Sequence, residues 1–199
     1  MNLHQSHLDI PPHQRPHRRT PRSKLPPPLL HPGHRSAAHR PPPPVPVNPK
    51  RSAQITKLKE TGNASFKKSQ FGDAVRMYSL ALDMALARPL WEPAGLVREE
   101  LSMLYGNRAQ AHMAQQNWAE AAVDAECSVE LKKVANVKGW WRRGVCLKEM
   151  GRLEEAREWL REAVEFESAG PDKQGVTELQ GLVNEVERLA ESRKGKGFE

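Results

Sequence analysis

Residues 143–164, RGVCLKEMGRLEEAREWLREAV, carry the pattern that decides the fold of this 199-residue chain. Ala156 is followed by Leu160 four positions later and by Ala163 seven positions later. This spacing places the three side chains along one stripe of a helix, with small residues where a second helix can approach closely. Gly151 interrupts the apolar spacing, which predicts a turn between two helices.

The same pattern occurs twice more, which indicates an internal repeat. Residues 62–82 (GNASFKKSQFGDAVRMYSLAL) and 108–129 (RAQAHMAQQNWAEAAVDAECSV) place Ala74 and Ala121 at the position of Ala156. The three alanines are spaced by 47 and 35 residues. Since a helix-turn-helix unit of about 34 residues is an established repeat period, the first spacing is about 13 residues too long.

We assign these extra residues to a long loop at residues 87–99, ARPLWEPAGLVRE, which contains Pro89 and Pro93. The sequence then predicts an all-α solenoid of three helix-turn-helix repeats over residues 50–192. The expected repeats lie at about 55–88, 102–135 and 137–168, followed by a capping helix at 173–192 and a frayed end at 193–199. Ser52 is the expected cap of the first helix. The expected buried stripe of the capping helix consists of Leu179, Leu182, Val186 and Leu189.

The excess charge of the chain is concentrated before this domain. The chain has 31 Lys and Arg against 24 Asp and Glu, a formal charge of +7. Residues 1–50 hold eight of the basic residues, 14 of the 17 prolines and a single acid, Asp9. Such a segment lacks the apolar side chains that offset the entropy of ordering, so we expect residues 1–49 to be a disordered Pro/His/Arg-rich tail. The remaining residues carry 23 bases and 23 acids.

The sequence disfavours several classes of protein. No apolar run approaches the roughly 20 residues of a membrane span, so we expect a chain that is neither membrane-spanning nor secreted. Cys127 and Cys146 lack partners at metal-ligand spacing and are expected to be small, buried thiols in a reducing compartment. The domain has one histidine, His112, and no glycine-rich phosphate loop, so we expect no enzyme, no metal and no cofactor.

Five polar residues lie at related positions on the first helices of the repeats: Lys59, Asn63, Asn107, Lys138 and Arg142. Asn107 and Arg142 each precede the alanine of their repeat by fourteen positions. Lys59 and Asn63 are four residues apart, as are Lys138 and Arg142, so each pair shares one face of its helix. We expect all five side chains to line the inner, concave side of the solenoid.

The three cations in this set have no acidic neighbour on their own helices. The positions three and four residues from Lys59, Lys138 and Arg142 hold no carboxylate. Two cations at i and i+4 repel each other, and a cation in the first turn opposes the helix dipole. Any one of these residues alone is explained as an ordinary solvent-exposed side chain. Together, at matching positions in their repeats, they indicate a binding site for an external anion.

The motifs KETGN (59–63), NRA (107–109) and KGWWR (138–142) resemble the dicarboxylate clamp of chaperone-adaptor tetratricopeptide-repeat (TPR) domains. The resemblance implies binding of the C-terminal Glu-Glu-Val-Asp tail of seventy-kilodalton, or else ninety-kilodalton, heat-shock chaperones. It also implies that the five residues hold the terminal carboxylate and the last Asp side chain. Charge-assisted bonds from Lys and Arg, with Asn as a neutral donor, suit these two groups.

Phe66, Gln110 and Met113 lie about one turn further along the same helices. We expect them to form a pocket for the apolar side chain that precedes the terminal Asp of such a peptide.

A resemblance over longer stretches of sequence indicates one branch of this family. Residues 48–63, 85–101, 107–118 and 138–159 are similar to the small cytosolic TPR subunit of the fungal Sec translocation complex. This similarity implies a non-enzymatic adaptor that brings chaperone-held precursors to the endoplasmic-reticulum translocon. It implies a peripheral location at the cytosolic face of that membrane and membrane Sec subunits as partners. In that family an N-terminal domain docks on a membrane subunit, whereas residues 1–49 do not resemble such a domain.

Two other functions stay open. One is a free cytosolic co-chaperone with no link to a translocon. The other is nucleic-acid binding through the basic tail, which is disfavoured because no aromatic residues are interleaved with its basic ones.

Overall fold

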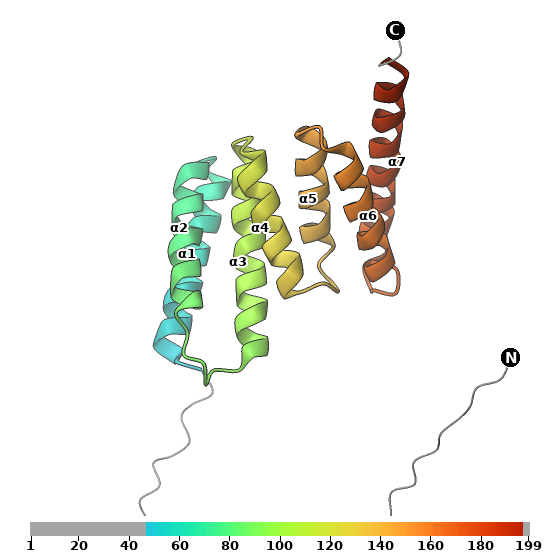
Figure 1. The fold of residues 1–199 in the computed structure, drawn as a ribbon. Helices are drawn as coiled ribbons and strands as arrows, with labels where there is room; N and C mark the ends of the chain where they lie inside the picture. The colour runs from blue at the N-terminus through green and yellow to red at the C-terminus, as the bar shows by residue number, and fades with distance from the viewer. Residues whose placement is uncertain (1–46, 197–199) are drawn as a thin grey trace, which may run out of the picture. The chain divides into compact units, whose positions relative to one another are not determined.

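The computed structural model describes residues 47–196, and every regular element in this range is an α-helix (Figure 1). In chain order the helices are α1 (Pro49–Lys67), α2 (Phe71–Leu86), α3 (Ala94–Ala114), α4 (Trp118–Leu131), α5 (Val137–Glu149), α6 (Leu153–Glu167) and α7 (Lys173–Lys196). The predicted all-α repeat array is confirmed for this part of the chain. Residues 1–46 of the predicted tail, and residues 197–199 of the predicted frayed end, lie outside the described residues.

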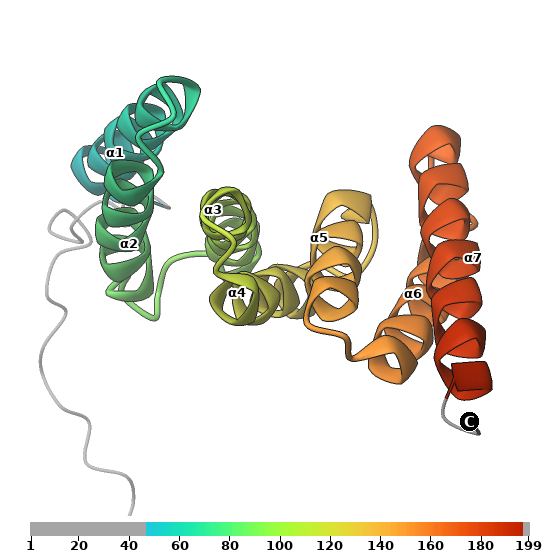
Figure 2. The ribbon, with the colours of Figure 1, turned by 90° about the horizontal axis from the view of Figure 1, so that it is seen from above.

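The helices form three consecutive pairs followed by the capping helix α7. Each helix contacts the next one along the chain, and the first helices of neighbouring pairs also touch, α1 with α3 and α3 with α5. Within residues 47–196 the second helices do not contact one another in this way. Figure 2 accordingly shows α1, α3 and α5 along one side of the array and α2, α4 and α6 along the other. The first helices therefore form the inner side, as expected.

The first helix begins earlier than the sequence suggested. Asn48 caps α1, since its Oδ1 accepts from the backbone N–H groups two and three residues further on. Pro49 occupies the first helical position, where its missing N–H costs nothing. The prediction that Ser52 caps the helix is wrong. Ser52 lies inside α1, and its Oγ accepts a hydrogen bond from Arg88 Nη2 at 3.0 Å.

The turns within the three pairs fall where the apolar spacing breaks. Ser69, Gln116 and Gly151 adopt left-handed backbone conformations, with φ of 61°, 61° and 74°. A single left-handed residue after a helix ends it and turns the chain. These turns let the second helix of each pair fold back against the first.

The connection between α2 and α3 is shorter than predicted. Residues 94–99 are helical and lengthen α3, so that only residues 87–93 join the two helices. Pro93 is the N-cap of α3. A proline is tolerated at the start of a helix as readily as it ends one, and the sequence pattern alone did not separate the two cases.

Small residues allow the paired helices to approach closely. Ala74, Ala121 and Ala156 are completely buried. In the third pair, Gly144 of α5 lies so close to α6 that a Cβ on it would stand 2.4 Å from Cδ2 of the buried Leu160. The predicted stripe of alanine and leucine is therefore the contact surface of the pairs.

The capping helix covers the apolar end of the third pair. Leu179, Leu182 and Val186 are buried as expected, but Leu189 is exposed and Val183 is buried in addition. At 3.6 residues per turn the buried stripe drifts around a long helix, which moves the later positions off the predicted face. The helix also continues past the predicted end at 192 to Lys196, because no proline follows to stop it.

Neither cysteine is bonded to another residue through sulfur. Cys146 is buried as predicted, and burial raises the pKa of its thiol to about 12. Cys127 is only half-buried. In residues 47–196 we find no helix both long and apolar enough to cross a bilayer.

A buried carboxylate holds the start of α5. Glu167, the last residue of α6, accepts hydrogen bonds from the backbone N–H groups of Asn136 at 2.7 Å and Ala135 at 3.1 Å. Asn136 in turn caps α5 by accepting from the N–H of Gly139 at 3.3 Å. These bonds anchor the first turn of α5, which contains Lys138.

Replacing Gly144 with Ala is expected to lower the free energy of unfolding by about 1–3 kcal/mol, because the added methyl group must displace buried Leu160. Urea denaturation measures the change. The matched control is Gly181→Ala in α7, where nothing lies within 4 Å of the added Cβ. This control should gain up to about 1 kcal/mol from helix propensity. Similar effects of the two substitutions would contradict a tight contact between α5 and α6.

Candidate functional site

The five predicted site residues lie on the three inner helices. Lys59 and Asn63 belong to α1, Asn107 to α3, and Lys138 and Arg142 to α5. Asn107, Lys138 and Arg142 line one cavity of about 410 Å³, here called the polar cavity. Its volume is in the range of ligand-binding clefts. Lys59 and Asn63 do not line this cavity themselves.

Lys59 and Asn63 are connected to the polar cavity through side chains of α3. Lys59 Nζ lies 3.7 Å from Sδ of Met103, and Met103 lines the cavity. Asn63 Oδ1 accepts a hydrogen bond from Nδ2 of Asn107 at 3.5 Å. The structure therefore brings all five residues into one connected group.

Asn63 has a structural partner that the sequence did not suggest. The buried Tyr78 of α2 donates its hydroxyl hydrogen to Asn63 Oδ1 at 2.7 Å. Burial raises the pKa of Tyr78, which keeps this hydroxyl protonated. Gly62 makes the contact possible, because a Cβ there would stand 2.6 Å from the Tyr78 ring. With its oxygen occupied, Asn63 offers its amide N–H groups to an external acceptor.

The three cations of the group form no ion pair within the described residues. Arg142 donates to the neutral Oε1 of Gln110 at 2.9 Å, and Lys138 has no hydrogen-bond partner. Burial lowers the pKa of Arg142, and no carboxylate offsets that effect. By contrast, Arg108 on the same inner layer donates twice to Asp124, at 2.7 Å each. The uncompensated positive charge beside the polar cavity attracts anions.

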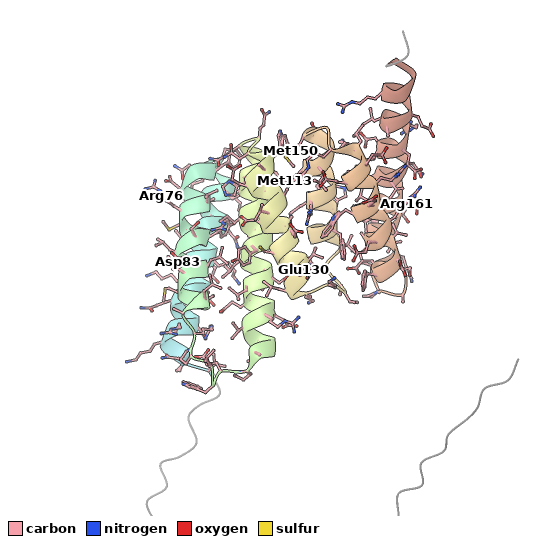
Figure 3. All side chains as sticks on the ribbon, in the orientation of Figure 1. Arg76, Asp83, Met113, Glu130, Met150 and Arg161 are labelled. Carbon is pink, nitrogen blue, oxygen red and sulfur yellow. The ribbon has the colours of Figure 1, made fainter. Side chains whose placement is uncertain are left out.

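A second cavity of about 540 Å³, here called the apolar cavity, adjoins the first. The two share Gln110, Lys138 and Arg142. Phe66, Gln110 and Met113, the predicted side-chain pocket, all line it. Met113 also packs, with Met150, beside buried Ala122 and Cys146, and Figure 3 shows these two methionines close together. We call the two adjoining cavities the inner groove, which has a cationic part and an apolar part.

Several residues of the inner groove were missed. Trp141 lines the apolar cavity between the two α5 cations, and Glu178 adds a carboxylate from α7. Gly106 leaves space for Arg142, since a Cβ there would stand 3.3 Å from Arg142 Nη1. Trp141 could have been found, because it shares a helix face with Lys138 and Val145. Glu178 could not have been found in this way, because no local sequence pattern predicts that α7 contributes to the cavity.

His112 lies outside both cavities. Its Nε2 is 4.0 Å from Oδ2 of Asp124, and burial lowers the pKa of His112. In the part of the chain that the structure describes, no group of three or more His, Cys, Asp or Glu is placed to hold a metal ion. The groove residues themselves can bind an anionic, partly apolar ligand through charge, hydrogen bonds and apolar contact.

Known proteins similar to this chain include tetratricopeptide-repeat proteins. The tetratricopeptide repeat family matches residues 137–168, the third helix pair. The ER protein translocation subcomplex subunit sec67 of Schizosaccharomyces pombe is 37% identical over 126 residues, which cover 62% of this chain and 65% of that protein. The chain thus spans just under two thirds of this relative.

Two solved structures share the fold. The second TPR domain of human RPAP3, in complex with the HSP70 peptide SGPTIEEVD, is 26% identical with a TM-score of 0.51, over 66% of this chain and 97% of that one. A chain of the Sec complex from S. cerevisiae is 23% identical with a TM-score of 0.61, over 78% of this chain and 80% of that one. The Sec complex chain shows the shared fold, while sec67 is a translocation subunit and the RPAP3 domain binds a peptide, which supports the prediction of an adaptor.

Substitution of the unpaired cation Arg142 by Gln should change the free energy of unfolding by less than about 1 kcal/mol, since no carboxylate loses its partner. Arg108→Gln is the matched comparison, because it strands the buried carboxylate of Asp124. It should destabilise the domain by about 3 kcal/mol. Urea denaturation at neutral pH measures both. If the free energy of unfolding falls as much in the Arg142 variant as in the Arg108 variant, Arg142 stabilises the fold rather than serving a binding site.

Proposed function

We propose that this chain, whose residues 137–168 match the tetratricopeptide repeat family, is a non-enzymatic adaptor whose inner groove binds the C-terminal peptide of a heat-shock chaperone. One observation carries the proposal. Lys59, Lys138 and Arg142 have no carboxylate partner in residues 47–196, yet Lys138 and Arg142 line a cavity of about 410 Å³ and Lys59 contacts Met103 in its wall. A C-terminal Asp supplies two carboxylates on one residue, which is the ligand that such a cluster of cations lacks.

The roles of the five residues follow from their positions. Lys138 and Arg142 of α5, with Asn107 of α3, surround the carboxylates in the polar cavity. Asn63, whose oxygen is held by Tyr78, donates from its amide nitrogen, and Lys59 closes the group from α1. Arg142 exchanges its neutral partner Gln110 for an anion when the peptide enters. Each charge-assisted hydrogen bond contributes roughly 1.5–3 kcal/mol, part of which is offset by ordering the peptide.

The apolar cavity takes the side chain that precedes the terminal Asp. Phe66, Met113 and Trp141 offer apolar contact next to the cations, within a volume of about 540 Å³. The peptide bound to the RPAP3 domain, SGPTIEEVD, has this order of an apolar residue followed by a C-terminal Asp. The likeness of the two domains supports a Glu-Glu-Val-Asp tail as the ligand class. We propose seventy-kilodalton chaperones as the first candidates and ninety-kilodalton ones as the alternative.

We further propose that the adaptor works at the cytosolic face of the endoplasmic-reticulum membrane, as a peripheral subunit of a Sec translocation complex. The identity of 37% to sec67 over 126 residues supports this location and these partners. In this function the groove brings chaperone-held precursors to the translocon for post-translational translocation.

A direct test is titration of the full chain with the peptide SGPTIEEVD and with its C-terminal amide. The free acid should bind with a Kd on the order of micromolar, more weakly as salt rises, because exposed charges carry the attraction. Loss of one carboxylate in the amide should weaken binding at least about tenfold. Isothermal titration calorimetry measures both constants. Equal affinity for acid and amide would exclude a carboxylate clamp.

Lys138→Ala and Arg142→Ala should each weaken binding of the free acid by about tenfold or more. The control is Arg76→Ala, which removes an exposed cation on the outer helix α2 (Figure 3), where it pairs with Asp73 at 2.6 Å. Its affinity should stay at the wild-type value. If all three variants bind alike, the inner cations do not form the site.

The translocon part of the proposal is tested separately by isolating the tagged full chain from detergent-treated membranes. Membrane Sec subunits should co-purify with the wild type and equally with the Arg142→Ala variant, while the chaperone is lost from the variant. Recovery of chaperone without any Sec subunit would favour a free co-chaperone instead.

A further inference from the structure

The polar cavity has a third cation in its lining, to which the five predicted site residues assign no role. Lys132 lines this cavity together with Lys138 and Arg142. Among the described residues that line the inner groove, Lys132 is the one cation outside the predicted five. The single carboxylate in the lining of the polar cavity is that of Glu99, so this lining carries a net positive charge.

The backbone of Lys132 is fixed at the end of α4, where the connection to α5 begins (Figure 1). Its N–H donates to the carbonyl oxygens of Ser128 at 3.2 Å and Val129 at 3.0 Å. Its own carbonyl oxygen accepts from Nδ2 of Asn136 at 3.1 Å, and Glu167 holds the backbone of Asn136 in turn. The side chain of Lys132 therefore extends from a fixed point in the wall of the polar cavity.

The carboxylate beside Lys132 is weakly held. Nζ of Lys132 lies 4.0 Å from Oε1 of Glu99, which is too far for a hydrogen bond. The two side chains are 42% and 66% exposed, and ion pairs as exposed as this contribute little to stability. Because Glu99 lines the polar cavity too, its position shows that a carboxylate can stand beside Lys132 within the cavity.

An extended peptide presents its side chains alternately to the two cavities. Successive side chains of an extended chain point to opposite sides, and those two positions apart lie about 7 Å from each other on the same side. Gln110, Lys138 and Arg142 line both cavities and so form the boundary between them. A peptide along this boundary directs the terminal Asp and the residue two positions before it to the polar cavity, and the apolar residue between them to the apolar cavity.

We propose that Lys132 binds the carboxylate of an acidic residue two positions before the terminal Asp, and that it is thus a specificity-determining residue of the inner groove. This inference rests on the proposed binding of a C-terminal peptide. When the peptide enters, Lys132 exchanges the carboxylate of Glu99 for that of the ligand. Among tails that end in Asp, the groove then selects those with the order acid, apolar residue, Asp. An acid three positions before the end points away from Lys132 and is not selected.

The test is calorimetric titration of the full chain and of its Lys132→Gln variant at about 150 mM salt, where exposed charges more than about 8 Å apart are largely screened. Lys132→Gln should weaken binding of SGPTIEEVD about three- to fivefold, the effect of losing a partly exposed ion pair. With SGPTIEQVD, which lacks the acid two positions before the end, the substitution should change Kd less than about 1.5-fold. With SGPTIQEVD, which keeps that acid, the loss of about three- to fivefold should return.

Lys133→Gln is the matched control. Lys133 is the next residue and its side chain is 40% exposed, but it pairs with Glu130 at 3.4 Å and Glu162 at 3.9 Å and lines neither cavity. Its variant should bind all three peptides with the wild-type Kd, and circular dichroism should show both variants folded.

The role of Lys132 is overturned if Lys132→Gln weakens all three peptides equally, or weakens none of them, while the free acid of SGPTIEEVD still binds better than its amide. In either case the five predicted residues hold the peptide without Lys132. Equal affinity for the free acid and the amide has a different meaning, because it excludes the carboxylate clamp itself and the role of Lys132 with it.

Discussion

The close approach of paired helices at small residues is the constraint on which this structure depends. Ala74, Ala121 and Ala156 are completely buried, and Gly144 lies against Leu160 with no room for a methyl group. Because the same contact recurs in each pair, the pairs stack in the same orientation. The first helices α1, α3 and α5 therefore turn equivalent faces to the inner side. A site assembled from three helices is a consequence of that repetition.

The stability provided by these contacts allows the inner side to leave charges unpaired. Cations needed by the fold have carboxylate partners, as Arg108 has Asp124 and Arg88 has Glu92 and Glu100. The cations of the groove do not, and Arg142 is left with a neutral amide partner. Residues that violate local electrostatic preferences in an otherwise consistent structure are the ones expected to serve binding. The two kinds of cation cannot be told apart by residue type.

Features that depend on neighbouring residues were predictable from the sequence, whereas contacts between distant residues were not. The turns at Ser69, Gln116 and Gly151 and the helical faces of the five clamp candidates were predictable, because both depend on spacings of a few residues. The helical continuation at residues 94–99 was not, because Pro89 and Pro93 fit either a loop or a helix start. The bond between Asn63 and Tyr78 was missed for another reason: it joins two helices across a contact that no periodicity describes.

The sequence by itself determined that this chain forms helix pairs, where they turn, and which side chains share a helix face. Those properties follow from hydrogen bonds and side-chain contacts within about one turn. Only the tertiary structure decided which faces meet. Asn107 lies within 3.5 Å of Asn63 although 44 positions separate them, and Arg142 reaches Gln110 across 32 positions. Such contacts depend on the crossing angles and spacing of whole helices, which are set by the packing of many side chains at once.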